Sequence, residues 1–436
     1  MIGIIGLIFA ILILSILAYK GVSALPLTLL AGLVVILTNR MDIWTSYSEY
    51  YLSGYVGFFK GYFLIFASSS LYAKVMEDSG AAVAIGYKFV DWFGKQRAVL
   101  VVFLSTAVLT YGGVSLFVVI FAVLPIIMVL FKEGDVPRRL AAGCLGAGAA
   151  TFTMTTLPGS PQLTNVIPSR FLGTPLTAAP VFSIIAAIFQ FVLLYAYLRW
   201  EEKRLREAGE HFSYIEGQDV KQYEIDRDQL PSAFASFLPL VVLIVLIIAL
   251  KGVIDNATML VVAAMCVATV LATVLHWSRL KDKMKTINVG LSSAVPAIAS
   301  PCAVVGFGTL VQNSSSFVDI VAWINSFNMN PYVSGTLATA IISGITGSSS
   351  GGLQIALQTF GEQFMQSGAN LQILHRLIAI AAGSLDSLPH SSGVFLMLAI
   401  LGLNHKSSYR FFGITTVVIP LITFVIFTAG IIVLGI

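Results

Sequence analysis

The sequence has 436 residues, of which 57% are apolar and only 11% are charged. Soluble globular proteins carry about 25% charged residues, so this composition excludes a water-soluble globule. The net charge of +4 is small and the basic residues flank apolar runs, which excludes a nucleic-acid-binding surface. The apolar runs do not alternate with polar residues, so a transmembrane β-barrel is excluded as well. The sequence predicts an all-α polytopic membrane protein.

About ten apolar runs are long enough to cross a bilayer, which takes about 20 residues per helix. The first has no Lys or Arg before Lys20, so we interpret it as a retained helix rather than a signal peptide. The ten predicted transmembrane helices lie near 2–19, 22–39, 59–76, 138–157, 181–199, 233–250, 257–276, 287–311, 373–401 and 412–434.

Two other charge-free segments, 98–131 and 331–365, are too long for one crossing and too short for two crossings plus a turn. Each has a cluster of glycine and hydroxyl residues at its centre, at 110–115 and at 346–352. We therefore expect two re-entrant helical hairpins, with arms of about 12 to 16 residues that reach about 18 to 24 Å into the membrane.

The basic residues indicate the orientation. If both hairpins are re-entrant, most of the 25 Lys and Arg residues fall on one side of the membrane. By the positive-inside rule that side is the cytoplasm, so we expect a bacterial-type inner membrane protein with both termini outside. The basic residues expected on or nearer the other side are Arg40, Lys60, Arg170, Lys251 and Arg376.

A polar stretch at 200–231 carries charges of both signs and is expected to be a cytoplasmic linker. An odd number of crossings before it inverts the second half, and inverted repeats are typical of secondary transporters. The N-terminal repeat is 1–199, with three helices, hairpin 98–131, a broken helix at 138–170 and a helix at 181–199. The C-terminal repeat is 232–436, with three helices, hairpin 331–365, a broken helix at 373–401 and a helix at 412–434.

The fifth helix of each half contains a proline in mid-membrane, within the similar segments 155–160 and 386–391. Proline breaks the helix, and the freed backbone groups are tolerated only where they line a cavity or pack against protein. We therefore expect both hairpin tips and both breaks to converge. The N-terminal ends of half-helices attract anions and freed carbonyls attract cations, which favours a site for a small carboxylate.

Small and hydroxyl residues in these four clusters are the candidate substrate-binding groups. Such residues are also common where membrane helices pack closely, so any one of them could serve packing alone. The candidates are Thr110, Gly112, Gly113, Ser115, Thr155, Thr156, Pro158, Gly159, Ser160, Ser348, Ser349, Ser350, Gly351, Ser387, Pro389 and Ser391.

Asp386 is the only acid predicted deep within a membrane helix, and His390 follows four residues later. Ionisable residues in membranes are costly and indicate function, and these two groups can exchange protons. We interpret them as the proton-coupling pair. Two alternatives are that Asp386 binds sodium or that it caps a half-helix. His375 is expected near a membrane edge, with a surface role.

An enzyme is not expected. Asp386, His390 and a nearby serine suggest a hydrolase, but no GxSxG elbow follows a strand. The three cysteines have no metal-ligand spacing, so neither a metal site nor a cofactor is predicted. A channel is disfavoured because the expected hairpins block a continuous polar path.

The segment from Gly383 to Gly393, followed by Leu401 to Lys406 and Tyr409, resembles the gluconate-permease (GntP) family of the ion-transporter superfamily. Within it, the segment is similar to the branch of permeases for hydroxybutyrate or short hydroxy acids. The resemblance implies uptake of small hydroxy-monocarboxylates, such as 3-hydroxybutyrate or gluconate, by proton symport. It also implies a homodimer whose scaffold domain holds an elevator-like transport domain.

Two alternatives remain on the same scaffold, a sodium-coupled carboxylate symporter and a sodium/proton antiporter. The four clusters contain no Arg or Lys. One carboxylate can be held by helix N-termini alone, whereas a di- or tricarboxylate would recruit a cation, which favours a monocarboxylate.

Overall fold

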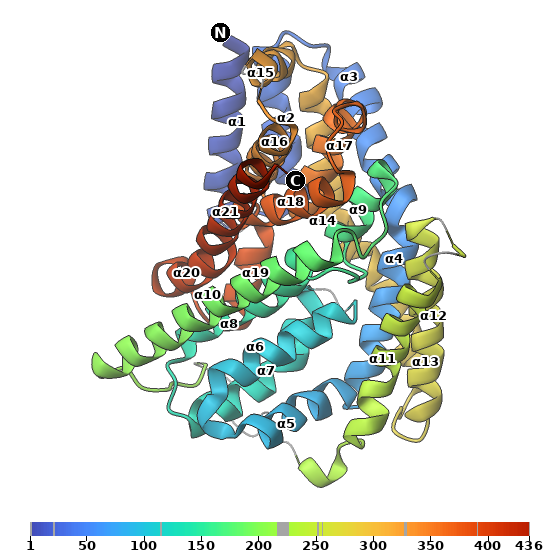
Figure 1. Ribbon diagram of the computed structural model, residues 1–436, viewed down its shortest axis with the longest axis vertical. Coiled ribbons are helices and arrows are strands. Elements are labelled where there is room, and N and C mark those ends of the chain that lie inside the picture. The colour runs from blue at the N-terminus through green and yellow to red at the C-terminus, as the bar shows by residue number, and fades with distance from the viewer. Residues whose placement is uncertain are drawn as a thin grey trace.

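The computed structural model describes residues 2–20, 22–113, 116–215, 226–250, 253–254, 256–326, 329–389 and 391–435. These residues form helices and connections and no strand, which confirms the predicted all-α class (Figure 1). Five helices in the described part are long and apolar enough to cross a membrane: Pro180–Glu207, Ala233–Leu250, Thr258–Leu275, Lys283–Gln312 and His405–Leu434. Shorter apolar helices are Ile2–Leu14, Ala24–Thr38, Ala98–Tyr111 and Leu371–Leu385.

The helices pack as two bundles. In the first bundle, α4 and α14 pack along each other. The helix α2, which is paired with α1, packs on α14, and the helix α12, which is paired with α11, packs on α4 (Figure 1). Its helices are α1 (Ile2–Tyr19), α2 (Ala24–Thr38), α3 (Ile43–Thr45), η1 (Ser46–Tyr51), α4 (Leu52–Asp78), η6 (Arg227–Gln229), α11 (Ala233–Leu250), α12 (Ala257–Leu275), α13 (Lys283–Ser292) and α14 (Ala294–Gln312).

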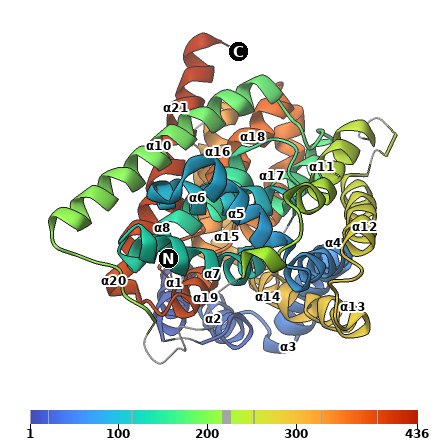
Figure 2. The same ribbon diagram turned by 90° about the horizontal axis from the view of Figure 1, so that it is seen from below.

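The second bundle contains both hairpins and both interrupted helices. Seen from below, the first bundle follows the lower and right-hand edge and the second bundle fills the rest (Figure 2). Its helices are α6 (Ala98–Tyr111), α7 (Leu116–Glu133), η3 (Arg138–Leu140), α8 (Ala141–Leu145), η4 (Gly146–Thr156), α9 (Leu163–Leu172), α10 (Pro180–Glu207), α16 (Pro331–Thr346), α17 (Ser349–Gln366), α18 (Leu371–Leu385), α19 (Ser392–Ile400), α20 (His405–Gly413), η7 (Ile414–Val418) and α21 (Ile419–Leu434). The connections from the first bundle are α5 (Ala81–Phe93) with η2 (Lys95–Arg97), and α15 (Ser315–Ser326).

Two antiparallel helix pairs, α6 with α7 and α16 with α17, lie where the sequence predicts hairpins. Their turns use glycine because the backbone takes positive φ, 85° at Gly113 and 64° at Gly347, which costs glycine nothing in steric strain. Ser348 then caps α17, because its hydroxyl accepts from the Gly351 amide at 3.2 Å.

The two long interrupted segments break near the predicted prolines. The helix η4 ends at Thr156, the chain is extended at Leu157, and α9 begins at Leu163. In the second half, α18 ends at Leu385 and α19 begins at Ser392. Each break therefore leaves two helix ends inside the second bundle.

Several helices are longer than the apolar runs predict, among them α4 and α10. The run at 59–76 belongs to a helix that begins at Leu52 and follows η1, and α10 continues to Glu207, into the predicted linker. Ion pairs explain the second extension. The buried carboxylate of Glu201 pairs with Arg204 at 2.7 Å and with Arg410 of α20 at 2.8 Å. Pairs three residues apart stabilise a helix that hydropathy alone would end.

Close packing of η4 on α6 depends on Gly148. A Cβ at this position would overlap the Phe103 carbonyl oxygen and the Thr106 side chain of α6. Because one of these is backbone, Gly148→Ala should separate the two helices and cost about 1 to 3 kcal/mol. Gly430→Ala in α21 is the matched control, since its Cβ would meet nothing within 4 Å. Thermal unfolding in detergent measures both. Equal midpoints would contradict the packing argument.

Candidate functional site

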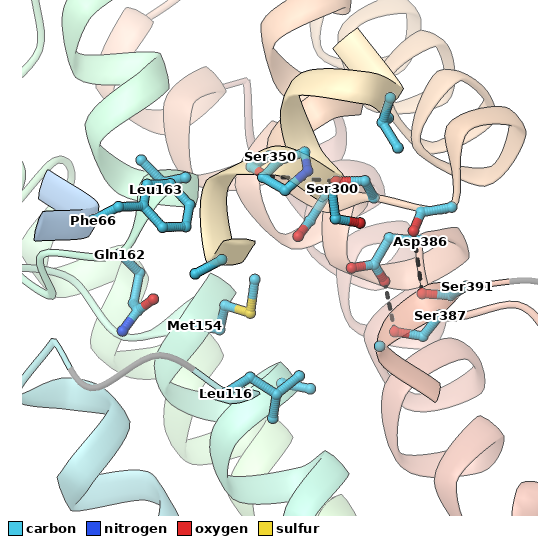
Figure 3. A pocket seen from close by; sticks show the side chains of 18 of the residues that line it. Phe66, Leu116, Met154, Gln162, Leu163, Ser300, Ser350, Asp386, Ser387 and Ser391 are labelled. Atoms are coloured by element: carbon cyan, nitrogen blue, oxygen red, sulfur yellow. Dashed lines mark hydrogen bonds between the residues drawn. The ribbon is translucent and has the colours of Figure 1, made fainter. Parts of the chain in front are cut away.

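A cavity of about 160 Å³ lies between the two bundles (Figure 3). Its volume is room for roughly ten water molecules at about 15 Å³ each, which suits a small metabolite. The first bundle contributes Ile65, Phe66, Ser69 and Ser70 of α4 and Ala297, Ser300, Pro301 and Val304 of α14.

The other wall brings together parts of both halves. Of the candidate residues, Gly113, Ser348, Ser349, Ser350, Asp386, Ser387 and Ser391 line the cavity. Gly113 belongs to the first hairpin, the three serines at 348–350 to the second, and Asp386 to the second break. Nine other candidates are described but do not line it: Thr110, Gly112, Thr155, Thr156, Pro158, Gly159, Ser160, Gly351 and Pro389. Ser115 and His390 lie outside the described residues.

Asp386 lies at the C-terminal end of α18, partly exposed to the cavity. Its carboxylate accepts from the Ser387 hydroxyl at 2.8 Å. The hydroxyl and backbone amide of Ser349 also interact with this carboxylate. Because Ser349 is the first residue of α17, the carboxylate sits at the helix end whose free amides and partial positive charge favour anions.

The second hairpin is tied to the second break around this carboxylate. The Ser391 hydroxyl donates to the Gly347 carbonyl at 3.1 Å, and the Tyr409 hydroxyl of α20 donates to the Ser387 carbonyl at 3.1 Å. Asp386, Ser387 and Ser391 project toward one another in the close view (Figure 3). The α17 end is therefore held in a fixed position beside Asp386.

The first break, in contrast, satisfies its own polar groups. The Tyr111 hydroxyl donates to the Pro158 carbonyl at 2.8 Å, and the Asn165 amide donates to the Ser160 hydroxyl at 2.7 Å. Thr155, Thr156 and Ser160 are fully buried. This break contributes a mainly apolar wall to the cavity, made of Met154, Pro161, Gln162 and Leu163.

Sequence reasoning missed Arg376, a fully buried cation of α18. Its Nη1 donates to the Thr155 carbonyl at 3.1 Å and to Asn165 Oδ1 at 2.7 Å, and its Nε donates to Ser183 Oγ at 2.9 Å. No ion pair among the described residues includes Arg376, and its Nη2 makes no hydrogen bond there.

The four clusters contain no Arg or Lys in sequence, but the fold brings one to them, and one expectation about α18 is wrong. A cation does reach one of the four clusters, because α18 crosses η4 and brings Arg376 to the first break. His375 is not a surface residue. It is fully buried, and its Nδ1 lies 2.7 Å from the Thr174 hydroxyl. The sequence does contain a signal, because an imidazole and a cation stand next to each other in an apolar run. The run does not show how deeply these two side chains are buried.

Near the cavity α17 packs on the first bundle, and we call this contact the seal. The Tyr62 hydroxyl of α4 donates to Gln354 at 2.8 Å, and the Gln312 amide of α14 donates to Thr359 at 2.8 Å and to the Ile355 carbonyl at 3.2 Å. The residues of α4 and α14 that line the cavity lie beyond this seal, toward the ends of the helices marked by Lys74 and by Lys283 and Lys285.

Comparison with known proteins assigns the chain to a family. Residues 1–434 match the family described as GntP family permease. The chain belongs to the GntP permease family. This match confirms the resemblance seen at 383–409. It shows that the protein is a multi-pass membrane transporter rather than an enzyme.

Individual relatives agree with this assignment. This GntP permease is 32% identical over 438 residues to the uncharacterized transporter YxjC of Bacillus subtilis, covering 92% of this chain and 93% of the relative. It is 24% identical over 331 residues to an uncharacterized transporter of Haemophilus influenzae, covering 74% of each. The crystal structure of the Alcanivorax borkumensis YdaH transporter superposes with a TM-score of 0.51 and 16% identity over 88% of each chain. At that identity the likeness concerns the fold alone.

Proposed function

We propose that this GntP permease takes up small hydroxy-monocarboxylates, such as 3-hydroxybutyrate or gluconate, together with protons. The observation that supports this most is the Asp386 carboxylate at the N-terminal end of α17 inside the cavity. That helix end is also the best place for the carboxylate of a substrate.

Asp386 and the substrate carboxylate would share the N-terminal end of α17, and this couples the binding of the proton to the binding of the substrate. Two carboxylates close together disfavour each other's charged form, so an arriving anion favours protonation of Asp386. Protonation in turn releases the α17 amides and removes the repulsion. By linkage, the proton and the anion then promote each other's binding to the same extent, which is the requirement for symport.

The cavity favours a single carboxylate. Asp386 is the only charged side chain among the described residues that line it. A helix end supplies about half an elementary charge, enough to favour one carboxylate but not two or three. Arg376 lies behind the first break, bonded to Thr155 and Asn165, rather than in the cavity wall.

The arrangement supports an elevator mechanism. The second bundle carries Asp386 and both hairpins, while α4 and α14 of the first bundle supply the facing wall. We infer that the second bundle slides along the first, and that the first bundle also forms the contact of a homodimer. With the lysine-bearing ends in the cytoplasm, the cavity opens inward in the bacterial inner membrane, α17 seals the outer side, and both termini lie outside.

Uptake into liposomes tests the function. Purified protein is reconstituted, and labelled 3-hydroxybutyrate and gluconate are supplied outside with an alkaline interior. At least one of them should accumulate above its equilibrium level and should exchange in counterflow without a gradient. If neither these acids nor any other monocarboxylate enters, the proposal is wrong.

Sodium coupling is the second candidate, because the Asp386 carboxylate and the nearby serine hydroxyls are oxygen ligands of the kind that hard cations prefer. Replacing the pH gradient by an inward sodium gradient separates sodium symport from proton symport. An antiporter would instead change the internal pH of the liposomes when sodium is added without any organic acid.

A further inference from the structure

Three consecutive serines in the middle of α4 differ in what their hydroxyls do. Ser68 donates back to the carbonyls of Leu64 at 2.8 Å and Ile65 at 3.1 Å, as a serine inside a helix commonly does. Ser69 and Ser70 make no side-chain hydrogen bond with the described residues, and both line the cavity. Each hydroxyl therefore keeps one donor and two acceptor positions for a solute.

Most polar side chains on the opposite wall are already engaged within the protein. Ser387 donates to Asp386, Ser391 donates to the Gly347 carbonyl, and Gln162 donates to the Thr110 carbonyl at 2.7 Å. These bonds hold the loops around the α17 end. A solute whose carboxylate binds there can extend its other end to α4, which also lines the cavity.

Apart from Ser69, Ser70 and Ser300, the wall that it meets is apolar and made of Ile65, Phe66, Ala297, Pro301 and Val304. A hydroxyl that loses water against such a wall without a partner is costly. Where the wall supplies a partner, a site can distinguish the hydroxylated molecule from the analogue that lacks the hydroxyl. When the analogue binds, the polar groups of the site lose their bound water and gain no hydrogen bond in its place.

We propose that Ser69 and Ser70 form a subsite for the hydroxyl group of the substrate, so that the first bundle selects hydroxy acids over plain acids. This inference rests on the proposed function, since it concerns which monocarboxylates are taken up. It assigns selectivity to α4, on the opposite side of the cavity from Asp386 and the hairpin tips.

Paired uptake of 3-hydroxybutyrate and butyrate tests the subsite. The unaltered permease should prefer the hydroxy acid in kcat/KM. The double variant Ser69→Ala/Ser70→Ala should reduce that preference by about tenfold, the effect of one or two lost hydrogen bonds. Butyrate uptake should stay within about twofold. Ser68→Ala is the matched control, because its hydroxyl bonds to its own helix, and it should keep the preference.

Ligand-induced thermal stabilisation gives a second readout that needs no transport. Stabilisation depends on ligand concentration relative to the dissociation constant, so the double variant should require about tenfold more 3-hydroxybutyrate for the same shift. If both acids are transported and the double variant keeps the original preference, the subsite is wrong and the proposed function stands. If the unaltered permease takes up neither these two acids nor gluconate or any other monocarboxylate, and is stabilised by none of them, the proposed function fails, and the subsite with it.

Discussion

Asp386→Asn is expected to abolish proton-driven accumulation of substrate while leaving exchange of internal for external substrate. The amide cannot take up a proton, so the pH gradient no longer contributes free energy. It carries no negative charge either, so the N-terminal end of α17 remains available to the substrate carboxylate. Uptake into liposomes with an alkaline interior should fall to the equilibrium level, whereas counterflow without a gradient should remain within about tenfold of the original rate.

The control for this variant is Asp91→Asn. Asp91 lies on α5, half exposed, and its carboxylate is 3.5 Å from Arg227. Exposed ion pairs contribute little, so this variant should accumulate substrate normally. Proton-driven accumulation that survives in Asp386→Asn would remove Asp386 from the coupling step.

Arg376→Met should be the most destabilising single change in the second bundle. It leaves three buried acceptors without their donor: the Thr155 carbonyl, Asn165 Oδ1 and Ser183 Oγ. Buried hydrogen bonds to a charged group contribute about 1.5 to 3 kcal/mol each in water-soluble proteins and less in membranes, so a total of about 2 to 4 kcal/mol is expected. Uptake should be lost as well, because the first break that forms one wall of the cavity depends on these bonds.

Two further variants separate charge from geometry. Arg376→Lys keeps the charge but offers a single ammonium in place of a planar fork, so an intermediate unfolding midpoint and partial uptake are expected. Arg97→Gln removes an exposed cation from the end of η2 and should change neither. If Arg376→Met unfolds at the original temperature and transports normally, the bonds of Arg376 do not support the site.

Much of the helix order follows from local pattern. Glycine clusters within charge-free segments indicate the helix pairs at 98–131 and 331–365, and prolines in apolar runs indicate the breaks near Pro158 and Pro389. These features depend on residues that are neighbours in the chain. The extension of α10 past Trp200 was not predicted, because hydropathy ends the helix where charged residues begin, and because one partner of Glu201 is Arg410, which is distant in the chain.

The site was predicted less completely, because its walls come from distant segments. Arg376 bonds to Thr155, 221 residues earlier, and no local pattern reveals that α18 crosses η4. The same limit applies to the serines of α4. The sequence does not distinguish Ser68 from Ser69 and Ser70, yet only the last two line the cavity.

The seal made by Tyr62 and Gln312 on α17 has a consequence for the direction of flux. Its three neutral hydrogen bonds contribute about 1 kcal/mol each, so these bonds by themselves hold α17 on the first bundle only weakly. Under the proposed elevator mechanism, these bonds would not lock either orientation, and transport would be reversible. Under the proposed proton symport of hydroxy acids, a cell rich in such an acid and poor in proton-motive force would lose it through the same protein.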